Sequence, residues 1–149
     1  MIDSLKQIAI GSDHAGFVLK EYIKSHFDHS EYVFHDFGTF SEEAMDYPDT
    51  AHPLAKAVQS GEYKFGILIC GSGNGVAIVA NKYTGIRAAI CWNEEITKLA
   101  RRHNDANIVV LPSRFISNEE AVRFVGLFLD TAFENGRHQR RVDKIIEIL

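Results

Sequence analysis

The sequence predicts an α/β fold with an open parallel sheet of five strands, helices on both faces, and an added C-terminal tail helix. Short apolar runs of strand length alternate with segments of helical periodicity from end to end. The third apolar run ends in a glycine-rich turn, CGSGNG, before the next helical segment. Because strands joined through helices pair in parallel by right-handed crossovers, this alternation favours a Rossmann-like arrangement.

Length and composition indicate an ordinary globular protein. The chain has 149 residues, which we expect to form one domain over 1–149. A net charge of −4 argues against bulk attraction to nucleic acid or to an anionic membrane, but allows a local basic pocket. There is no apolar run of the ~20 residues that a membrane-spanning helix needs. The two cysteines look like free thiols, so we expect a cytoplasmic location.

The first half of the chain contains two predicted strands and two predicted helices. Residues 7–13 and 32–37 are apolar runs of strand length, and a helix lies between them. The second helix begins at Pro48, a favoured first-turn position for proline, and ends at Gly61.

Three further strands are predicted at residues 65–70, 87–91 and 108–111, the last stopped by Pro112. Helices follow each of them. One runs to about Lys82, one runs from the N-cap Asn93 to about His103, and one starts with the capping box of Ser117 and Glu120. A tail helix is expected over 137–149, where the apolar stripe consists of Val142, Ile145, Ile146 and Leu149.

The glycine-rich turn after residues 65–70 is the strongest local signal of function. Several backbone N–H groups can approach a bound oxygen there, and the following helix adds its partial positive charge. Cys70 stands at the mouth of this turn as a potential base or nucleophile, with its thiolate favoured by the same dipole. A buried core cysteine beside a tight turn is the structural alternative.

The predicted topology gathers distant residues at one edge of the sheet. In a parallel sheet, the turns after all strands meet at the carboxyl edge, where such folds bind ligands. These turns are residues 13–14, 36–38, 70–75, 91–93 and 112–114. We therefore expect Asp13, His14, Cys70 and Ser72 to be neighbours.

Several familiar sites do not fit the sequence. The glycines alternate as G-x-G-x-G after the third strand, unlike the dinucleotide fingerprint G-x-G-x-x-G after the first. The nucleoside-triphosphate loop and the nucleophile elbow are absent. Seven histidines lack metal-ligand spacing, so no metal is predicted. Four of them are expected to face solvent: His26, His29, His35 and His52. His14 and His103 differ, because each lies at the end of a predicted helix.

A basic segment precedes the tail stripe. Arg137 and Arg141 are spaced i, i+4, so a helix presents both on one face, with His138 and Arg140 between them. Two guanidinium groups on one face suit a phosphate dianion. A solvated face at the chain end is the alternative.

Six segments in order resemble one enzyme family: GSDHAGF, DFGTF followed by DYP, ILICGSGNGVAIVANK, GIRAAIC, RRHNDANI and GRHQRRV. The chain resembles the type B ribose-5-phosphate isomerases and the related galactose-6-phosphate isomerase subunits. The resemblance runs from Gly11 to Val142, nearly the whole chain.

The resemblance implies aldose–ketose isomerisation of a sugar phosphate through an enediolate, specifically between ribose 5-phosphate and ribulose 5-phosphate. It implies Cys70 as the base that moves a proton between C2 and C1, Ser72 as its assistant, and His103 as the acid/base that opens the sugar ring. Asp13 would hydrogen-bond sugar hydroxyls, Asn104 would contact the substrate, and Tyr47 would line the substrate side. The backbone around Gly71, Gly73, Asn74 and Gly75 would stabilise the negative oxygen. His14, Arg137 and Arg141 would bind the phosphate, with Arg114 and His138 as further candidates.

The resemblance also implies partners. The family forms homodimers, or dimers of dimers, with shared active sites, so we expect the tail helix to reach a second copy. The only other expected partner is a small phosphorylated sugar; no cofactor, metal, nucleic acid or membrane is expected. Two alternatives remain open: an isomerase of a hexose 6-phosphate such as allose or galactose 6-phosphate, and a non-catalytic sugar-phosphate binding module.

Overall fold

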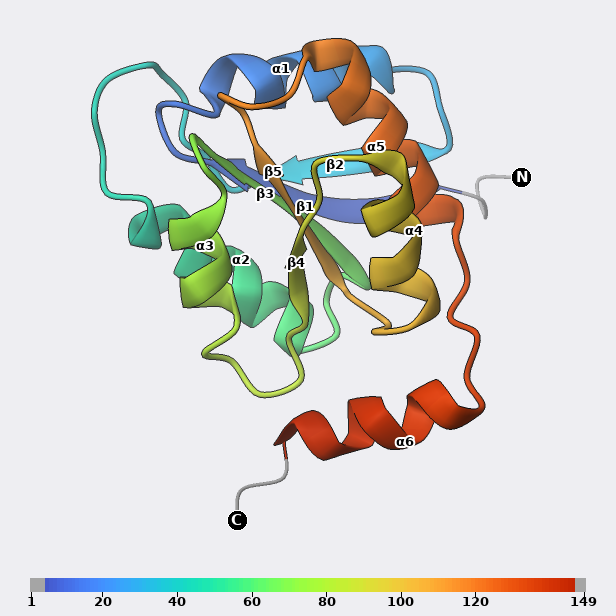
Figure 1. Ribbon diagram of the computed structural model, residues 1–149. Coiled ribbons are helices and arrows are strands. Elements are labelled where there is room, and N and C mark those ends of the chain that lie inside the picture. Colours follow the sequence, from blue (N-terminus) through green and yellow to red (C-terminus); the bar gives the residue numbers. More distant parts are fainter. Residues whose placement is uncertain (1–4, 147–149) are drawn as a thin grey trace.

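The structure is a computed structural model that describes residues 5–146. Five strands form one sheet in the order β2-β1-β3-β5-β4, and every neighbouring pair is parallel (Figure 1). The strands are β1 (Lys6–Ser12), β2 (Tyr32–Asp36), β3 (Phe65–Cys70), β4 (Ala88–Ile90) and β5 (Ile108–Pro112). The predicted open parallel sheet is confirmed.

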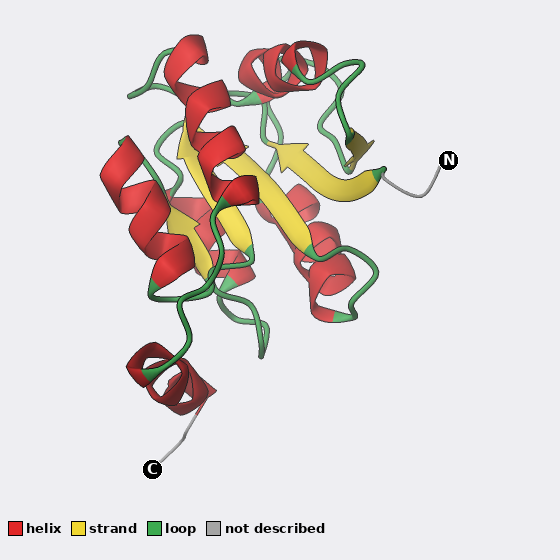
Figure 2. Ribbon diagram, turned by 90° about the vertical axis from the view of Figure 1, so that its right-hand side faces the viewer, coloured by secondary structure: helices red, strands yellow, loops and turns green. Residues whose placement is uncertain are grey.

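Five helices cover the two faces of this sheet, and a sixth lies apart. They are α1 (Phe17–His26), α2 (Pro48–Gln59), α3 (Asn74–Ala80), α4 (Glu94–Arg102), α5 (Asn118–Asp130) and α6 (Arg137–Asp143), with a 3₁₀ turn η1 (Lys144–Ile146) after α6. Helices α1, α4 and α5 pack on one face, and α2 and α3 on the other (Figures 1 and 2). Helix α6 lies beyond the amino ends of the strands.

The core follows from strand periodicity. In β3, Ile67 and Ile69 face α1, α4 and α5, whereas Leu68 and Cys70 face α2 and α3. The first three of these side chains are fully buried and Cys70 is nearly so. Both faces are covered, which explains why the strand reads as a continuous apolar run. Its position at the centre of the sheet holds the glycine turn on a rigid base.

The strand order creates a topological switch point between β1 and β3. From β1 the chain crosses through α1 to β2 on one side, and from β2 it crosses back through α2 to β3 on the other. Ligands of open α/β sheets bind in the crevice outside the carboxyl ends of the strands at such a point. Asp13 and Cys70 stand at the two sides of this crevice.

Two predicted boundaries differ from the structure. Strand β4 is shorter than the predicted 87–91, because the Arg87 N–H donates to the Asn107 side chain instead of to a neighbouring strand. Helix α6 gives way to η1 because the Lys144 N–H bonds back to Arg141, which tightens the last turn. Leu149 and the rest of the expected tail lie outside the described residues.

No helix within residues 5–146 is long and apolar enough to cross a membrane.

A buried ion pair fixes the loop that follows β2. Lys20 of α1 has a fully buried side chain, and its ammonium donates to both carboxylate oxygens of Asp36 at 2.7 and 2.6 Å and to the Thr39 carbonyl at 2.7 Å. Asp36 also accepts from the Gly38 N–H at 2.8 Å and from Lys24 at 2.8 Å. Burial alone would raise the pKa of Asp36, but the hydrogen bonds from Lys20, Lys24 and Gly38 outweigh it and lower that pKa.

Replacing Lys20 by Met should lower the free energy of unfolding by about 3–5 kcal/mol, because it leaves a carboxylate without its buried partner. Lys24→Met is the matched control, since Lys24 contacts the same carboxylate with a side chain 32% exposed; it should cost about 1 kcal/mol or less. Urea unfolding at several pH values measures both. Because the Asp36 pKa is lowered, its contribution is present above the ordinary carboxyl pKa of 3.8 and is lost as pH falls through the lowered value. Equal losses in both variants would contradict this account.

Candidate active site

A cleft of about 400 Å³ opens at the switch point between β1 and β3. Its walls come from the turns after β1, β3 and β5 and from the start of α2. The lining residues are Asp13, His14, Ala15, Tyr47, Cys70, Gly71, Ser72, Gly75, Arg114 and Phe115. The predicted meeting of Asp13, His14, Cys70 and Ser72 is therefore found in the structure.

Cys70 lies in the cleft as the last residue of β3 and is 5% exposed. The Gly73 N–H donates to its sulfur at 3.1 Å, and this donor would stabilise negative charge there. The Asn74 N–H donates to Ser72 Oγ at 3.2 Å. Gly73 has φ of +79°, a conformation that L side chains rarely adopt, so the turn that aims these N–H groups depends on glycine.

Asp13 and His14 are held by backbone contacts on the β1 side. Asp13 Oδ1 accepts from the Gly16 N–H at 2.9 Å, which fixes the turn into α1. The Met45 N–H donates to His14 Nδ1 at 3.2 Å. With Nδ1 as acceptor, a neutral His14 ring carries its proton on Nε2 and can donate it to a ligand.

Two glycines make room for larger side chains at the cleft wall. A Cβ on Gly75 would lie 2.7 Å from the Tyr47 ring, and one on Gly71 would lie 3.1 Å from the Arg114 guanidinium. The Arg114 N–H also donates to the Gly71 carbonyl at 3.0 Å. The glycine turn thus positions Tyr47 and Arg114 as well as Cys70.

Five predicted site residues lie at the opposite edge of the sheet. His103 caps the C-terminus of α4, Asn104 follows it, and both precede β5 at its amino end. Arg137, His138 and Arg141 lie on α6. The His103 and His138 rings stack with centroids 4.1 Å apart and planes 11° apart. Within one copy of the chain, these five residues are not brought together with Cys70.

Glu134 belongs to this second group, although sequence analysis did not single it out. Its Oε2 lies 3.4 Å from His138 Nε2, and its N–H donates to the Arg102 carbonyl at 3.0 Å. Burial lowers the pKa of His138, and the charges of His103 and Arg137 lower it further against the opposite effect of Glu134. Glu134 and His138 have the i, i+4 spacing, but the contact with His103 joins distant segments and leaves no mark in the sequence.

The two cysteines occupy different environments. Cys91 is fully buried outside the cleft, and burial raises the pKa of its thiol to about 11 despite the hydrogen bond with Thr97. Such a thiol is unreactive at neutral pH. Cys70 is the thiol that faces the cleft.

Sequence analysis also missed Ala15 and Phe115 of the cleft. Both directly follow predicted site residues, so extending each predicted turn by one residue would have found them. Phe115 also borders a second hollow of about 400 Å³ with Ser72, Asn74 and the exposed Trp92.

The four histidines expected to face solvent are all exposed.

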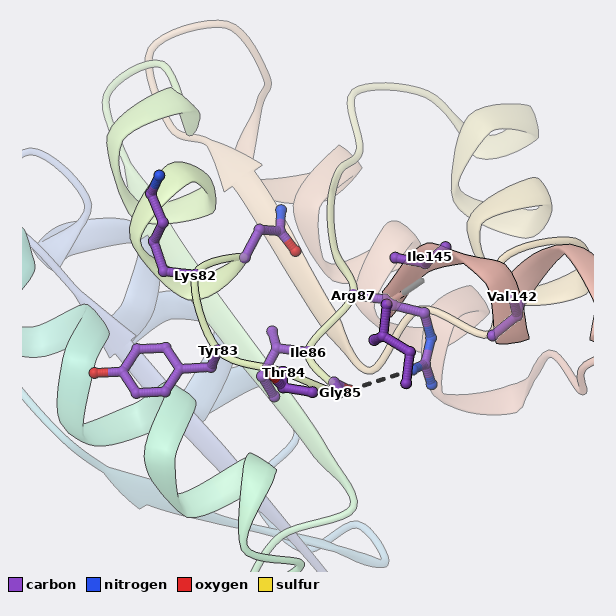
Figure 3. Close-up of a pocket in the computed structure, with 10 residues that line it drawn as sticks. Lys82, Tyr83, Thr84, Gly85, Ile86, Arg87, Val142 and Ile145 are labelled. Atoms are coloured by element: carbon purple, nitrogen blue, oxygen red, sulfur yellow. Dashed lines mark hydrogen bonds between the residues drawn. The ribbon is translucent and has the colours of Figure 1, made fainter. Parts of the chain in front are cut away.

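A groove of about 310 Å³ separates the tail from the turn between α3 and β4 (Figure 3). Val142, Ile145 and Ile146 line one side, and residues 81–87 line the other. Arg87 Nη1 donates to the Gly85 carbonyl at 3.2 Å in this turn. The groove lies at the amino edge, away from Cys70, and the apolar tail stripe is only partly covered: Ile145 and Ile146 are 57% and 60% exposed.

Comparison with known proteins bears on the identity of this cleft. A family profile described as Ribose/Galactose Isomerase matches residues 8–145. Ribose-5-phosphate isomerase B of Escherichia coli strain K12 is 44% identical over 144 residues, covering 97% of each chain. A crystal structure of a ribose 5-phosphate isomerase from Thermotoga maritima is 50% identical, with a TM-score of 0.93 over 96% of this chain and 99% of that one.

A ribose-5-phosphate isomerase B from Mycoplasma genitalium, solved with bound ribulose 5-phosphate, is 43% identical with a TM-score of 0.89 over 94% of this chain and 93% of that one. Identity and fold agree over nearly the full length of all these chains. The chain belongs to the Ribose/Galactose Isomerase family.

Proposed function

We propose that this protein interconverts ribose 5-phosphate and ribulose 5-phosphate. The observation that carries the proposal is the Cys70 thiol in the switch-point cleft, with the Gly73 N–H directed at its sulfur at 3.1 Å. Family membership supports it, since relatives at 44% and 50% identity are named for this pentose reaction. A sugar phosphate binder without activity would have no need of a thiol at this position.

The proposed chemistry is a proton transfer between two carbons. The Cys70 thiolate removes the proton from C2 of open-chain ribose 5-phosphate, and the electron pair of that C–H bond moves through C2 and C1 to the carbonyl oxygen. The resulting enediolate passes a proton from O2 to O1, assisted by the Ser72 hydroxyl, and the Cys70 thiol returns its proton to C1. The product is ribulose 5-phosphate.

The developing negative oxygen needs hydrogen-bond donors in the cleft. The Gly73 and Asn74 N–H groups already contact Cys70 Sγ and Ser72 Oγ. The neighbouring N–H groups of Gly71, Ser72 and Gly75 are therefore the proposed oxyanion donors. A donor of this kind contributes about 3–4 kcal/mol in comparable sites.

We propose further that two copies of the chain share each active site. The cleft contains the base. The ring-opening candidate His103, the substrate-contact candidate Asn104 and three of the phosphate candidates lie at the opposite edge: Arg137, His138 and Arg141. A second copy could bring its own amino edge to the cleft. The exposed Ile145 and Ile146 and the exposed Trp92 and Phe115 are surfaces that such a contact would cover.

A cytoplasmic location remains a prediction. Its support is that Cys70 and Cys91 are both free thiols.

Replacing Cys70 by Ala should lower kcat for ribulose 5-phosphate formation by about 10²-fold or more, because the general base is lost. Ribose 5-phosphate should still bind. Cys91→Ala is the matched control and should keep near-normal activity, since that thiol lies outside the cleft. The assay measures ribulose 5-phosphate with a metal chelator present.

Near-normal turnover by Cys70→Ala would remove it as the base. Turnover of allose 6-phosphate or galactose 6-phosphate, but not of ribose 5-phosphate, would show that the substrate is a hexose phosphate and that the reaction type is unchanged. Binding of sugar phosphates without any turnover would favour the binding module.

Mixing two inactive variants tests the shared site. One variant is Cys70→Ala and the other combines Arg137→Ala with Arg141→Ala. After joint refolding, random pairing in a two-fold dimer gives one intact site in half of the dimers, so about a quarter of wild-type activity should return. If each copy of the chain contains a complete site, the mixture stays as inactive as its components.

Gly75→Ala should lower kcat/KM about tenfold or more, because its Cβ displaces the Tyr47 ring from the cleft wall. In a Tyr47→Ala background the same change should cost little, since the ring it displaces is gone. The kcat/KM values of the four proteins form a double-mutant cycle. Equal losses in both backgrounds would show that Tyr47 is not what the glycine accommodates.

A further inference from the structure

Three donor side chains converge at the amino edge of the sheet, away from the cleft. His103 closes α4, Glu134 lies in the segment between α5 and α6, and His138 lies in the first turn of α6. One ligand-type atom from each lies within 4.8 Å of the other two. His138 is buried, His103 is half-buried and Glu134 is exposed, so the group is supported by the fold and reachable from solvent.

Two of the three donors already have the separation that a metal ion requires. Glu134 Oε2 and His138 Nε2 are 3.4 Å apart. Two ligands of a tetrahedral Zn²⁺ ion, each bound at about 2.0–2.2 Å, lie about 3.3–3.5 Å apart. The Glu134 N–H donates to the Arg102 carbonyl at 3.0 Å, and this bond ties the Glu134 backbone to the residue beside His103.

The third candidate ligand, the His103 ring, must rotate before it can bind the same ion as the other two. The His103 and His138 rings are nearly parallel at 4.1 Å, and two such rings cannot both direct a lone pair at one ion. Rotation of the His103 ring about its side-chain bonds would bring its nitrogen toward the other two donors. His103 is the C-cap residue of α4 and its side chain is half-buried, so this rotation does not take place within the closed core.

We propose that His103, Glu134 and His138 bind a Zn²⁺ ion. Two imidazoles and a carboxylate are a ligand set that zinc accepts, with its fourth position open to water. Arg137 and Arg141 carry positive charge near His138, so the site binds zinc more weakly than a structural zinc site does. Protons compete with a metal ion for imidazole and carboxylate ligands, so zinc binding weakens at acidic pH.

Zinc at this site inhibits the isomerase, a consequence that rests on the proposed function. The ion occupies the imidazole nitrogen that His103 needs for ring opening. Binding itself does not depend on that role, so the two can be tested separately.

Calorimetric titration of the chelator-treated full chain with Zn²⁺ is the first test. We expect one ion per chain, and Co²⁺ in its place should give the visible absorption of a tetrahedral site. Glu134→Gln and His138→Asn should each weaken zinc binding roughly tenfold or more, because each removes a ligand. Glu62→Gln, at an exposed position after α2, is the control and should leave both zinc affinity and metal-free activity unchanged.

Absence of binding up to millimolar Zn²⁺ would overturn the proposal, as would equal affinity in the wild type, Glu134→Gln and His138→Asn. Binding lost only in Cys70→Ala would assign the ion to the thiol and also overturn it. If His138→Asn displaces α6, the Glu134→Gln variant is the deciding one, since its amide keeps the size of the carboxylate and one acceptor oxygen but loses the negative charge.

Inhibition is measured as the zinc concentration that halves each variant's own metal-free rate, which should rise tenfold or more in Glu134→Gln. Zinc binding without inhibition would keep the site and remove His103 from catalysis. An enzyme inactive on every sugar phosphate would refute the proposed function, while the calorimetry would still decide the metal site.

Discussion

The parallel pairing of β1 with β3 is the constraint on which the candidate site depends. The Asp13 N–H donates to the Ile69 carbonyl at 3.1 Å, so the turn after β1 is bonded directly to the strand that ends at Cys70. A Cβ on Gly16 would lie 2.8 Å from that same carbonyl, so the turn can approach β3 only because glycine stands there. The relative position of Asp13 and Cys70 is thus set by backbone contacts, which side-chain motion cannot disturb.

The Lys20–Asp36 pair extends this order to the loop that precedes α2. The Ser12 N–H donates to the Gly38 carbonyl, and the Thr39 N–H donates to the Ser12 carbonyl, both at 2.7 Å. Lys20 and Asp36 bind this same segment, so the buried charges hold it against the end of β1. Further along the loop, the Met45 N–H bonds to His14, and Tyr47 then enters the cleft. A helix, an edge strand and a loop are therefore coupled to the position of two cleft residues.

The sequence was sufficient to predict features that depend on local chemistry. The capping box of Ser117 with Glu120 and the N-cap Asn93 formed as expected, because each satisfies nearby N–H groups. The meeting of Asp13 with Cys70 followed from topology, since every carboxyl end of a parallel sheet lies at one edge. The strand order was not predictable, because the sequence of an apolar strand does not indicate which other strands it pairs with. The contact of Glu134 and His138 with His103 is likewise tertiary, and metal-ligand spacing within one segment could not reveal it.

The division of the site residues between two edges has a consequence for assembly. The cleft contains a base and hydrogen-bond donors, whereas the amino edge contains the stacked imidazoles and the arginines of α6. Under the shared-site proposal neither half is sufficient, because the cleft of one copy lacks the ring-opening candidate His103 and the amino edge lacks the base Cys70. Under the shared-site proposal, association therefore creates the catalytic group and stabilises the chain by covering exposed apolar side chains. Activity and stability then depend on the same equilibrium, and a change that weakens the contact lowers both.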